Sequence, residues 1–186
     1  MKRILIPFIS IIFLLAGASF AFATKVYFSP NGGCQEAVIA TISKAQETID
    51  IAMYDFTSGP IAQELVKAKK RDVRIRIVLD KGQEQSEYSK KKYLLQKGFS
   101  LKYHTGSGLM HNKFAIIDGQ MLLTGSFNWT LMAEHKNEEN LLIITDQQVV
   151  SAYKKRFKYL YENSHTASSK THYNVNQHFQ SHPKFF

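Results

Sequence analysis

The chain has 186 residues, a formal net charge of +9 and a single cysteine, Cys34. One cysteine excludes an intramolecular disulfide, so a buried core must stabilise the fold. We expect Cys34 to be a small buried residue near the start of a helix. The basic composition favours polyanions or anionic lipid headgroups as ligands, and it does not distinguish between the two.

The first 23 residues have the pattern of a secretory signal peptide. Lys2 and Arg3 precede an apolar segment, which ends in the small-x-small sequence Ala21-Phe22-Ala23. Removing these 23 residues from the 186 leaves 163, which is the size of one domain. The predicted location is therefore outside the cell or in the periplasm. The alternative is a membrane-anchored protein that keeps this apolar segment.

Strands and helices alternate through the first half of the remaining chain. Compact or alternating apolar runs predict strands at Lys25–Ser29, Asp50–Tyr54 and Val73–Leu79. Apolar residues at helical spacing predict a helix between the first two strands, on Val38, Ile42, Ala45 and Ile49. A second helix begins near Ser58, has Pro60 in its first turn and runs to about Lys70. This alternation is typical of an α/β domain.

The second half continues with shorter elements. We expect a helix at Ser86–Gln96, strands at Ser100–His104, His111–Ile117, Gln120–Thr124 and Leu141–Thr145, and a closing amphipathic helix at Val149–Tyr161. The folded domain is therefore predicted to span residues 24–163. Residues 164–186 are polar and lack apolar periodicity, which predicts a disordered tail. The histidines in this tail are too irregularly spaced to indicate a metal site.

The stretch from His111 to Asn128 carries the chemistry of the chain, at His111, Lys113, Asp118, Gly125, Ser126 and Asn128. A strand at its start places the imidazole and the ammonium on one face, with Phe114 and Ile116 pointing into a core on the other face. The Asp118-Gly119 turn then reverses the chain. The loop that ends at Asn128 is therefore expected beside His111.

These side chains suit an anionic tetrahedral group such as a phosphodiester. The imidazole of His111 can attack phosphorus or donate a proton at neutral pH. Lys113, Ser126 and Asn128 can bind the non-bridging oxygens and offset the charge that develops in the transition state, with no need for a metal ion or cofactor. Two roles stay open for Asp118, which either orients a catalytic group or only forms the turn.

The spacing of these residues resembles the HKD motif of the phospholipase D superfamily, and its surroundings resemble the small secreted single-motif endonucleases of that superfamily. The resemblance implies a mixed central sheet flanked by helices on both faces, with one domain per chain. It also implies attack of His111 on phosphorus to give a phosphohistidine, with a second imidazole protonating the leaving oxygen. Glu139 matches a carboxylate that hydrogen-bonds the catalytic imidazole, although Glu138 and Glu139 also fit two solvated loop acids.

Many members of the superfamily carry two HKD motifs, whereas this chain has one. His104 and His135 lack a lysine two residues later, so neither belongs to a second copy. The resemblance therefore implies a homodimer in which His111 of both subunits shares one active site. The alternative is that another histidine of the same chain supplies the proton, with His135 and His104 the first candidates.

The leading hypothesis is a secreted, metal-independent phosphodiesterase that acts as a sequence-nonspecific endonuclease on DNA or RNA. Basic clusters accompanied by tyrosines fit non-specific nucleic-acid binding, at Lys67–Arg74, Lys90–Lys92 and Lys154–Lys158. The alternative substrate is anionic phospholipid, hydrolysed at the phosphatidyl headgroup or as cardiolipin by the same chemistry. A third hypothesis is an inactive nucleic-acid-binding module, which the intact motif disfavours.

Overall fold

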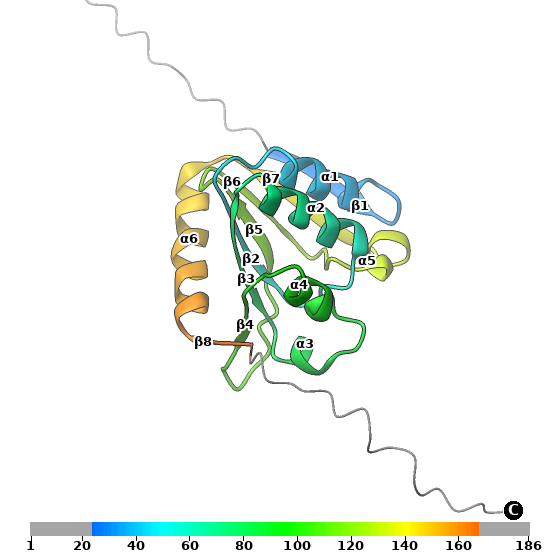
Figure 1. The fold of residues 1–186 in the computed structure, drawn as a ribbon. Helices are drawn as coiled ribbons and strands as arrows, with labels where there is room; N and C mark the ends of the chain where they lie inside the picture. The colour runs from blue at the N-terminus through cyan, green and yellow to red at the C-terminus, as the bar shows by residue number, and fades with distance from the viewer. Residues whose placement is uncertain (1–23, 168–186) are drawn as a thin grey trace, which may run out of the picture.

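The computed structural model describes residues 24–167, which form one mixed eight-stranded sheet with helices on both faces (Figure 1). The strand order is β1-β7-β6-β5-β2-β3-β4-β8. This arrangement confirms the predicted fold class. The predicted signal peptide, and the part of the predicted tail from residue 168 onward, lie outside the described residues.

The predicted elements occur along the chain in the predicted order, with some shifted ends, and three short elements that the patterns do not predict (α3, α5 and β8) are added. The strands are β1 (Thr24–Ser29), β2 (Thr48–Met53), β3 (Arg74–Leu79), β4 (Leu101–His104), β5 (Lys113–Ile117), β6 (Met121–Gly125), β7 (Glu139–Ile144) and β8 (Ser164–Thr166). The helices are α1 (Cys34–Ile42), α2 (Gly59–Lys70), α3 (Gly82–Gln85), α4 (Lys91–Gln96), α5 (Leu131–His135) and α6 (Gln147–Glu162). No helix within residues 24–167 has the length and apolarity needed to cross a membrane.

Strand β5, the first strand of the motif, lies in the middle of the sheet. It pairs antiparallel with β2 on one side, where Lys113 lies opposite Met53, and antiparallel with β6 on the other. Strands β2, β3 and β4 are parallel to one another, because helical crossovers return the chain to the same end of the sheet each time. The start of β5 therefore lies beside the carboxyl end of β2.

Two cores hold β5 in place, one on each face of the sheet. Helix α6 covers one face, where Phe114 and Ile116 pack with Val150, Phe157 and Leu160. This confirms the prediction that Phe114 and Ile116 point into a core. Ala115 and Ile117, on the same strand face as Lys113, are also buried, in the main core under α1 and α2. Only the start of β5 is therefore left to form a site.

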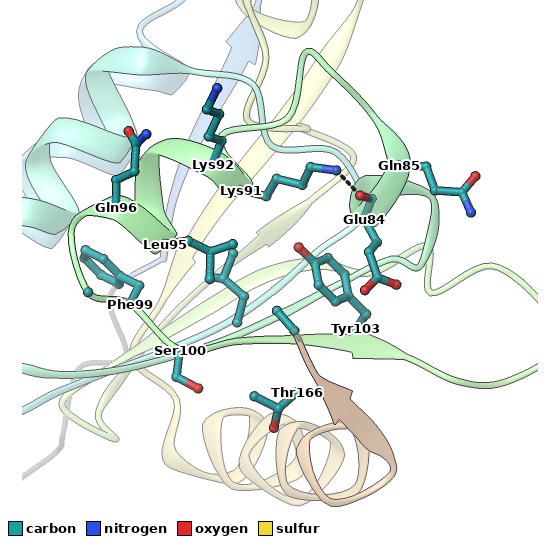
Figure 2. A pocket seen from close by; sticks show the side chains of 13 residues that line it. Glu84, Gln85, Lys91, Lys92, Leu95, Gln96, Phe99, Ser100, Tyr103 and Thr166 are labelled. Atoms are coloured by element: carbon teal, nitrogen blue, oxygen red, sulfur yellow. Dashed lines mark hydrogen bonds between the residues drawn. The ribbon is translucent and has the colours of Figure 1, made fainter. Parts of the chain in front are cut away.

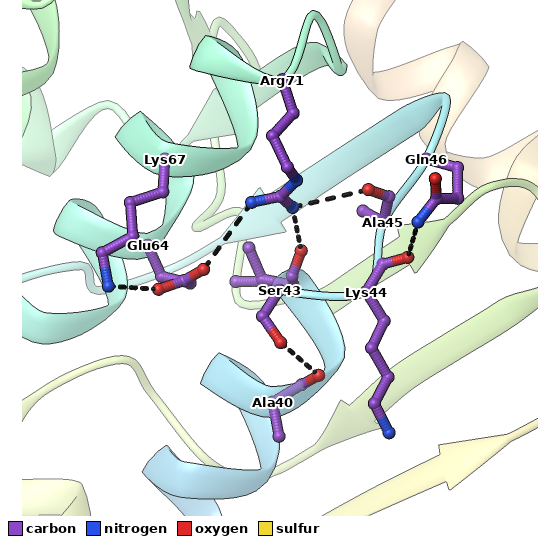
Figure 3. Close-up of polar contacts among 9 residues, drawn as sticks. Ala40, Ser43, Lys44, Ala45, Gln46, Glu64, Lys67 and Arg71 are labelled. Atoms are coloured by element: carbon purple, nitrogen blue, oxygen red, sulfur yellow. Dashed lines mark hydrogen bonds and ion pairs between the residues drawn. The ribbon is translucent and has the colours of Figure 1, made fainter.

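Helix α1 ends at Ile42, whereas the apolar spacing predicts a helix that continues through Ile49 (Figure 3). The guanidinium of Arg71 donates to the carbonyl oxygens of Ile42 at 3.1 Å and of Ala45 at 3.4 Å. The same side chain lies 3.9 Å from the carboxylate of Glu64, which is buried on α2. These contacts occupy carbonyl oxygens at the end of the helix and just after it. The chain then enters β2, where Ile49 is a buried residue.

Only the second half of the predicted helix at Ser86–Gln96 is helical, as α4, and a separate short helix, α3, ends just before it at Gln85. Ser86 has an extended backbone, and the hydroxyl of Ser89 accepts the N–H of Lys91 at 3.3 Å. Serine side chains that bond to nearby backbone groups compete with helix formation in this way. The helical segment therefore begins only at Lys91.

The ordered domain extends beyond residue 163, where the sequence pattern ends it. Ser164–Thr166 form β8, which pairs antiparallel with β4 at the edge of the sheet. The Ser164 hydroxyl donates to the carbonyl oxygen of Leu160 at 2.6 Å, which directs the chain out of α6 toward this edge. Three residues are too few for apolar periodicity to show, which explains why the sequence places them in the tail.

Cys34 is the first residue of α1 and is fully buried, as predicted. Burial and, to a smaller extent, the nearby carboxylate of Glu134 raise the pKa of its thiol to about 11. A thiol in this environment stays protonated at neutral pH, so Cys34 contributes packing volume to the core and not a reactive thiolate.

Candidate active site

A cavity of about 390 Å³ opens where β5 begins, β6 ends and β7 begins, and it is lined by His111, Lys113, Gly125, Ser126, Asn128 and Glu139. The three strands are consecutive antiparallel neighbours, so these ends meet at one edge of the sheet. Five of the six predicted site residues are therefore brought together. Asp118 is the exception.

Lys113 holds a largely buried positive charge in this cavity, since the residue is 8% exposed. Its Nζ donates to the carbonyl oxygen of His111 at 2.9 Å and lies 4.8 Å from the centre of the Tyr54 ring. Burial lowers the pKa of the ammonium, while Glu139 and Asp55 raise it. No ion pair within residues 24–167 includes Lys113, so its charge remains available to an anion in the cavity.

His111 is exposed, and the backbone on either side of it is fixed. The N–H of Met110 donates to the carboxylate of Asp80 at 2.7 Å, and the carbonyl oxygen of Asn112 accepts the N–H of Tyr54 at 2.9 Å. Asp80 is 2% exposed and also accepts the N–H of Gly82 at 2.8 Å. The imidazole itself packs against the Tyr54 ring, with ring centres 4.4 Å apart.

Sequence analysis missed both Asp80 and Tyr54. Each lies directly after a parallel strand, Tyr54 after β2 and Asp80 after β3. Groups at the carboxyl ends of adjacent parallel strands share one edge of a sheet, and ligand sites of open α/β folds lie at that edge. Their position after predicted strands was therefore a usable indication, although the pairing of β5 with β2 could not be inferred from it.

The last position of β6 requires a glycine. Gly125 has φ of 149°, and a Cβ there would lie 2.3 Å from the carbonyl oxygen of Asn140. Ser126 then donates its N–H to that oxygen at 3.1 Å, and its hydroxyl accepts the N–H of Asn140 at 3.0 Å. Ser126 therefore holds the loop against β7 and also lines the cavity.

Asn128 brings an amide group to the cavity. Its side-chain oxygen is buried and has no hydrogen-bond partner among residues 24–167. Buried amide groups are nearly always hydrogen-bonded, so this oxygen can accept a hydrogen bond from a ligand, and the NH2 of the same side chain is the group that can donate to an anion. The next residue, Trp129, is 2% exposed and packs edge-on against Phe56 in the main core. This packing fixes the end of the loop.

Glu139 is the first residue of β7 and lines the same cavity as His111. Its carboxylate accepts a hydrogen bond from the Asn137 side chain at 3.2 Å. None of the hydrogen bonds in the described part of the chain joins Glu139 to His111. The structure of the chain therefore does not contain the predicted bond between this carboxylate and the His111 imidazole.

Asp118 follows the opposite end of β5, five residues after Lys113. Because a strand rises about 3.3 Å per residue, Asp118 is far from the cavity. It has a positive φ of 51° in the turn before β6. Its carboxylate accepts the backbone N–H groups of Gln46, Glu47 and Thr48, and these bonds lower its pKa. Of the two roles left open by the sequence, the structural one fits this position, and a catalytic role does not.

The family follows from the match of the whole domain and not of the motif alone. Residues 38–161 match the family described as "Cardiolipin synthase, PLD-like domain", where PLD stands for phospholipase D. This match covers about two thirds of the chain. The chain belongs to the phospholipase D superfamily.

Relatives in this superfamily are named for different substrates. The chain is 38% identical over 118 residues to a mitochondrial cardiolipin hydrolase of Xenopus laevis, and 35% identical over 126 residues to a phospholipase D of Rickettsia typhi. These alignments cover 63% and 68% of this chain, and 56% and 62% of the relatives. The chain thus spans less than two thirds of the length of these curated relatives.

Among solved structures, the phospholipase D family member Nuc from Salmonella typhimurium superposes with a TM-score of 0.75 at 29% identity. The match covers 80% of this chain and 99% of the Nuc chain. NucT from Helicobacter pylori gives a TM-score of 0.72 at 25% identity, over 77% of this chain and 98% of that chain. The phospholipase D-like domain of this chain therefore corresponds to nearly the whole of both chains.

The cavity of this phospholipase D-like domain contains one imidazole, that of His111. His135 is exposed at the end of α5, with its Nδ1 3.1 Å from the Asn31 side chain, and it does not line the cavity. His104, on β4, does not line it either. Within residues 24–167, no three His, Cys, Asp or Glu side chains gather as ligands for a metal ion. The donors in the cavity are those of an anion site.

A wider cavity of about 1070 Å³ lies between α3, α4, β4 and β8 (Figure 2). Leu95, Phe99, Leu101 and Tyr103 form much of its apolar wall. None of the predicted site residues lines it. The smaller cavity at His111 is therefore the candidate active site, because the reactive groups lie there.

Proposed function

We propose that this protein is a secreted phosphodiesterase that cleaves nucleic acids without a metal ion, through a covalent intermediate on His111. One observation carries the proposal: an exposed imidazole shares a cavity with a buried ammonium that has no ion pair among the described residues. A phosphodiester fits this cavity because its negative charge can pair with the ammonium of Lys113. Its phosphorus is also an electrophile that the imidazole can attack.

In the proposed mechanism, a ring nitrogen of His111 forms a bond to phosphorus, and the bond from phosphorus to the leaving oxygen breaks. Lys113 and Asn128 bind the non-bridging oxygens as their charge grows. A second imidazole gives its proton to the leaving oxygen and then removes a proton from water. That water attacks the phosphohistidine, which releases the phosphate ester and restores His111.

The second imidazole comes, in this proposal, from the partner subunit of a homodimer. The cavity holds one histidine, so two copies must meet to bring two imidazoles to one phosphorus. Exposed apolar side chains near the motif support an interface at this face. Leu109 is 62% exposed two residues before His111, and Leu131 and Met132 are 57% and 60% exposed just after Asn128. In the dimer, Glu139 orients a catalytic imidazole.

The dimer can be tested by refolding wild-type chains together with His111→Ala chains in varying proportions. If two imidazoles are needed at one site, activity falls as the square of the wild-type fraction, because a mixed dimer has only one. A linear fall, or full activity of a monomer measured by light scattering, would show that each chain works alone.

Nucleic acid is the preferred substrate because the domain corresponds to nearly the whole of the Nuc and NucT chains. The second candidate is an anionic phospholipid, which is supported by the similarity to a phospholipase D and a mitochondrial cardiolipin hydrolase. Both substrates contain a phosphodiester, so the same residues serve either reaction.

In the deciding experiment, the purified protein is incubated separately with plasmid DNA, with RNA, and with vesicles of phosphatidylcholine or cardiolipin, all in EDTA. We expect cleavage of nucleic acid at a rate that falls steeply with salt, because phosphate contacts release counterions. Hydrolysis of cardiolipin with intact nucleic acid would assign the protein to the lipid substrate. Secretion is tested separately, by sequencing the amino terminus of the protein recovered outside the cytoplasm, which we expect to begin near Thr24.

A further inference from the structure

Tyr54 contacts both of the residues on which the proposed chemistry depends. Its ring centre lies 4.4 Å from that of the His111 imidazole, with the ring planes tilted by 58°. The same ring lies 4.8 Å from the Nζ of Lys113. The ring is partly buried and does not line the cavity, so it supports these side chains from behind.

The imidazole of His111 has little else to hold it. The residue is exposed, and none of the hydrogen bonds or ion pairs among residues 24–167 uses its ring nitrogens. Backbone bonds fix the chain on either side, but they leave the side-chain torsions free. The Tyr54 ring is therefore the contact that selects one orientation of the imidazole.

Three contacts make a closed set around the nucleophile. Lys113 donates to the carbonyl oxygen of His111, Lys113 lies over the Tyr54 ring, and the Tyr54 ring packs against the imidazole. In addition, the N–H of Tyr54 bonds the carbonyl oxygen of Asn112, which ties the end of β2 to the residue between His111 and Lys113. Tyr54 therefore sets the distance between the attacking nitrogen and the charge that binds the phosphate.

We propose that Tyr54 is a positioning residue that orients the His111 imidazole for attack and holds Lys113 beside it. This inference rests on the proposed phosphodiesterase function. It assigns the role to the aromatic face and not to the hydroxyl, because both contacts are made by the ring. Misplacement of a reacting group by about 1 Å costs on the order of 100-fold in rate, so loss of the ring affects kcat far more than KM.

The test compares Tyr54→Leu with Tyr54→Phe in the purified full-length protein. We expect Tyr54→Leu to lower kcat about 100-fold with KM changed less than about threefold, and Tyr54→Phe to keep kcat within about threefold of wild type. The matched control is Tyr153→Leu, whose ring packs against Phe114 on the opposite face of β5 and does not reach the cavity. Its kcat per folded molecule stays near the wild-type value.

A second readout does not depend on activity. An aromatic ring at this distance shifts the NMR resonances of the imidazole protons of His111, so we expect that shift to persist in Tyr54→Phe and to collapse in Tyr54→Leu. A shift that is unchanged in Tyr54→Leu, or a folded Tyr54→Leu protein with near-normal kcat, would overturn the positioning role. If wild-type protein hydrolyses neither nucleic acid nor phospholipid, the proposed function fails, and the NMR comparison still decides whether Tyr54 orients His111.

Discussion

The carboxylate of Asp80 accepts the backbone N–H of Met110 at 2.7 Å, immediately before His111. Asp80 follows β3, and β3 is not adjacent to β5, so this bond ties the nucleophile to a strand two positions away in the sheet. The carboxylate is buried and bonds Gly82 as well. The position of His111 therefore depends on a residue outside the motif.

Replacing Asp80 by alanine should weaken both the fold and the active site. Two backbone N–H groups lose a charged acceptor, which costs about 1.5 to 3 kcal/mol for each bond of this kind. We expect a lower urea midpoint and a lower kcat per folded molecule. Glu162→Ala is a suitable control, because Glu162 is exposed and lies 3.9 Å from Lys158. Unchanged stability in Asp80→Ala would contradict the role given to this carboxylate.

Asp118 should affect stability and not catalysis, although it belongs to the motif. Three backbone N–H groups bond its carboxylate and lower its pKa below the ordinary 3.8. The stabilisation is therefore present above about pH 4 and is lost as the pH falls through the lower, folded-state pKa. We expect Asp118→Asn to be about 1 to 3 kcal/mol less stable than wild type at pH 7.

The check on Asp118 is urea denaturation of wild type and Asp118→Asn at several pH values, together with kcat. The difference in stability should shrink below pH 4, and kcat per folded molecule should match that of wild type. A loss of kcat of more than about 100-fold in a folded Asp118→Asn protein would restore the catalytic role that the structure does not favour.

The charge of Lys113 should be necessary for turnover. Lys113→Met keeps much of the side-chain volume and removes the ammonium, so we expect kcat to fall by about 100- to 1,000-fold. Burial lowers the pKa of Lys113 from 10.5, so the wild-type enzyme should lose activity on the alkaline side before pH 10.5. The measurement is kcat/KM against pH for both proteins. A variant with wild-type kcat would remove Lys113 from the mechanism.

Gly125 and Gly108 offer a matched pair of glycine substitutions near the cavity. A Cβ on Gly125 would lie 2.3 Å from the carbonyl oxygen of Asn140, whereas nothing lies within 4 Å of a Cβ on Gly108. We therefore expect Gly125→Ala to displace the loop that carries Ser126 and Asn128, with loss of both stability and activity. Gly108→Ala should leave both unchanged. Thermal unfolding and kcat of the two variants measure the contrast.

The contacts that the sequence predicts are the local ones. Four cavity residues come from one hairpin, where the alternation of side chains along a strand and a tight turn determine which residues are neighbours: His111, Lys113, Ser126 and Asn128. Their placement was therefore predictable. The contact of Tyr54 with His111 depends on the pairing of β2 with β5, which no local pattern encodes.

Long-range polar contacts also account for the role of Asp118, which the sequence left open, and for the helix that the sequence extended too far. Asp118 bonds residues 46–48, about 70 positions earlier in the chain, so its structural role could not be seen in the motif. Arg71 likewise occupies the carbonyls at the end of α1 from 26 and 29 residues away. Apolar periodicity alone extends that helix too far. In both cases a long-range polar contact decides the local structure.

The measurement that most directly tests the central claim is detection of a phosphohistidine on His111 itself. Wild-type protein and His111→Ala would be mixed with substrate in EDTA, quenched at alkaline pH, digested and analysed by mass spectrometry. We predict a phosphoester adduct on the peptide that contains His111 in wild type, and neither adduct nor turnover in His111→Ala. Turnover in His111→Ala at a near-normal rate, or activity of wild type that appears only when a divalent metal is restored, would contradict the account.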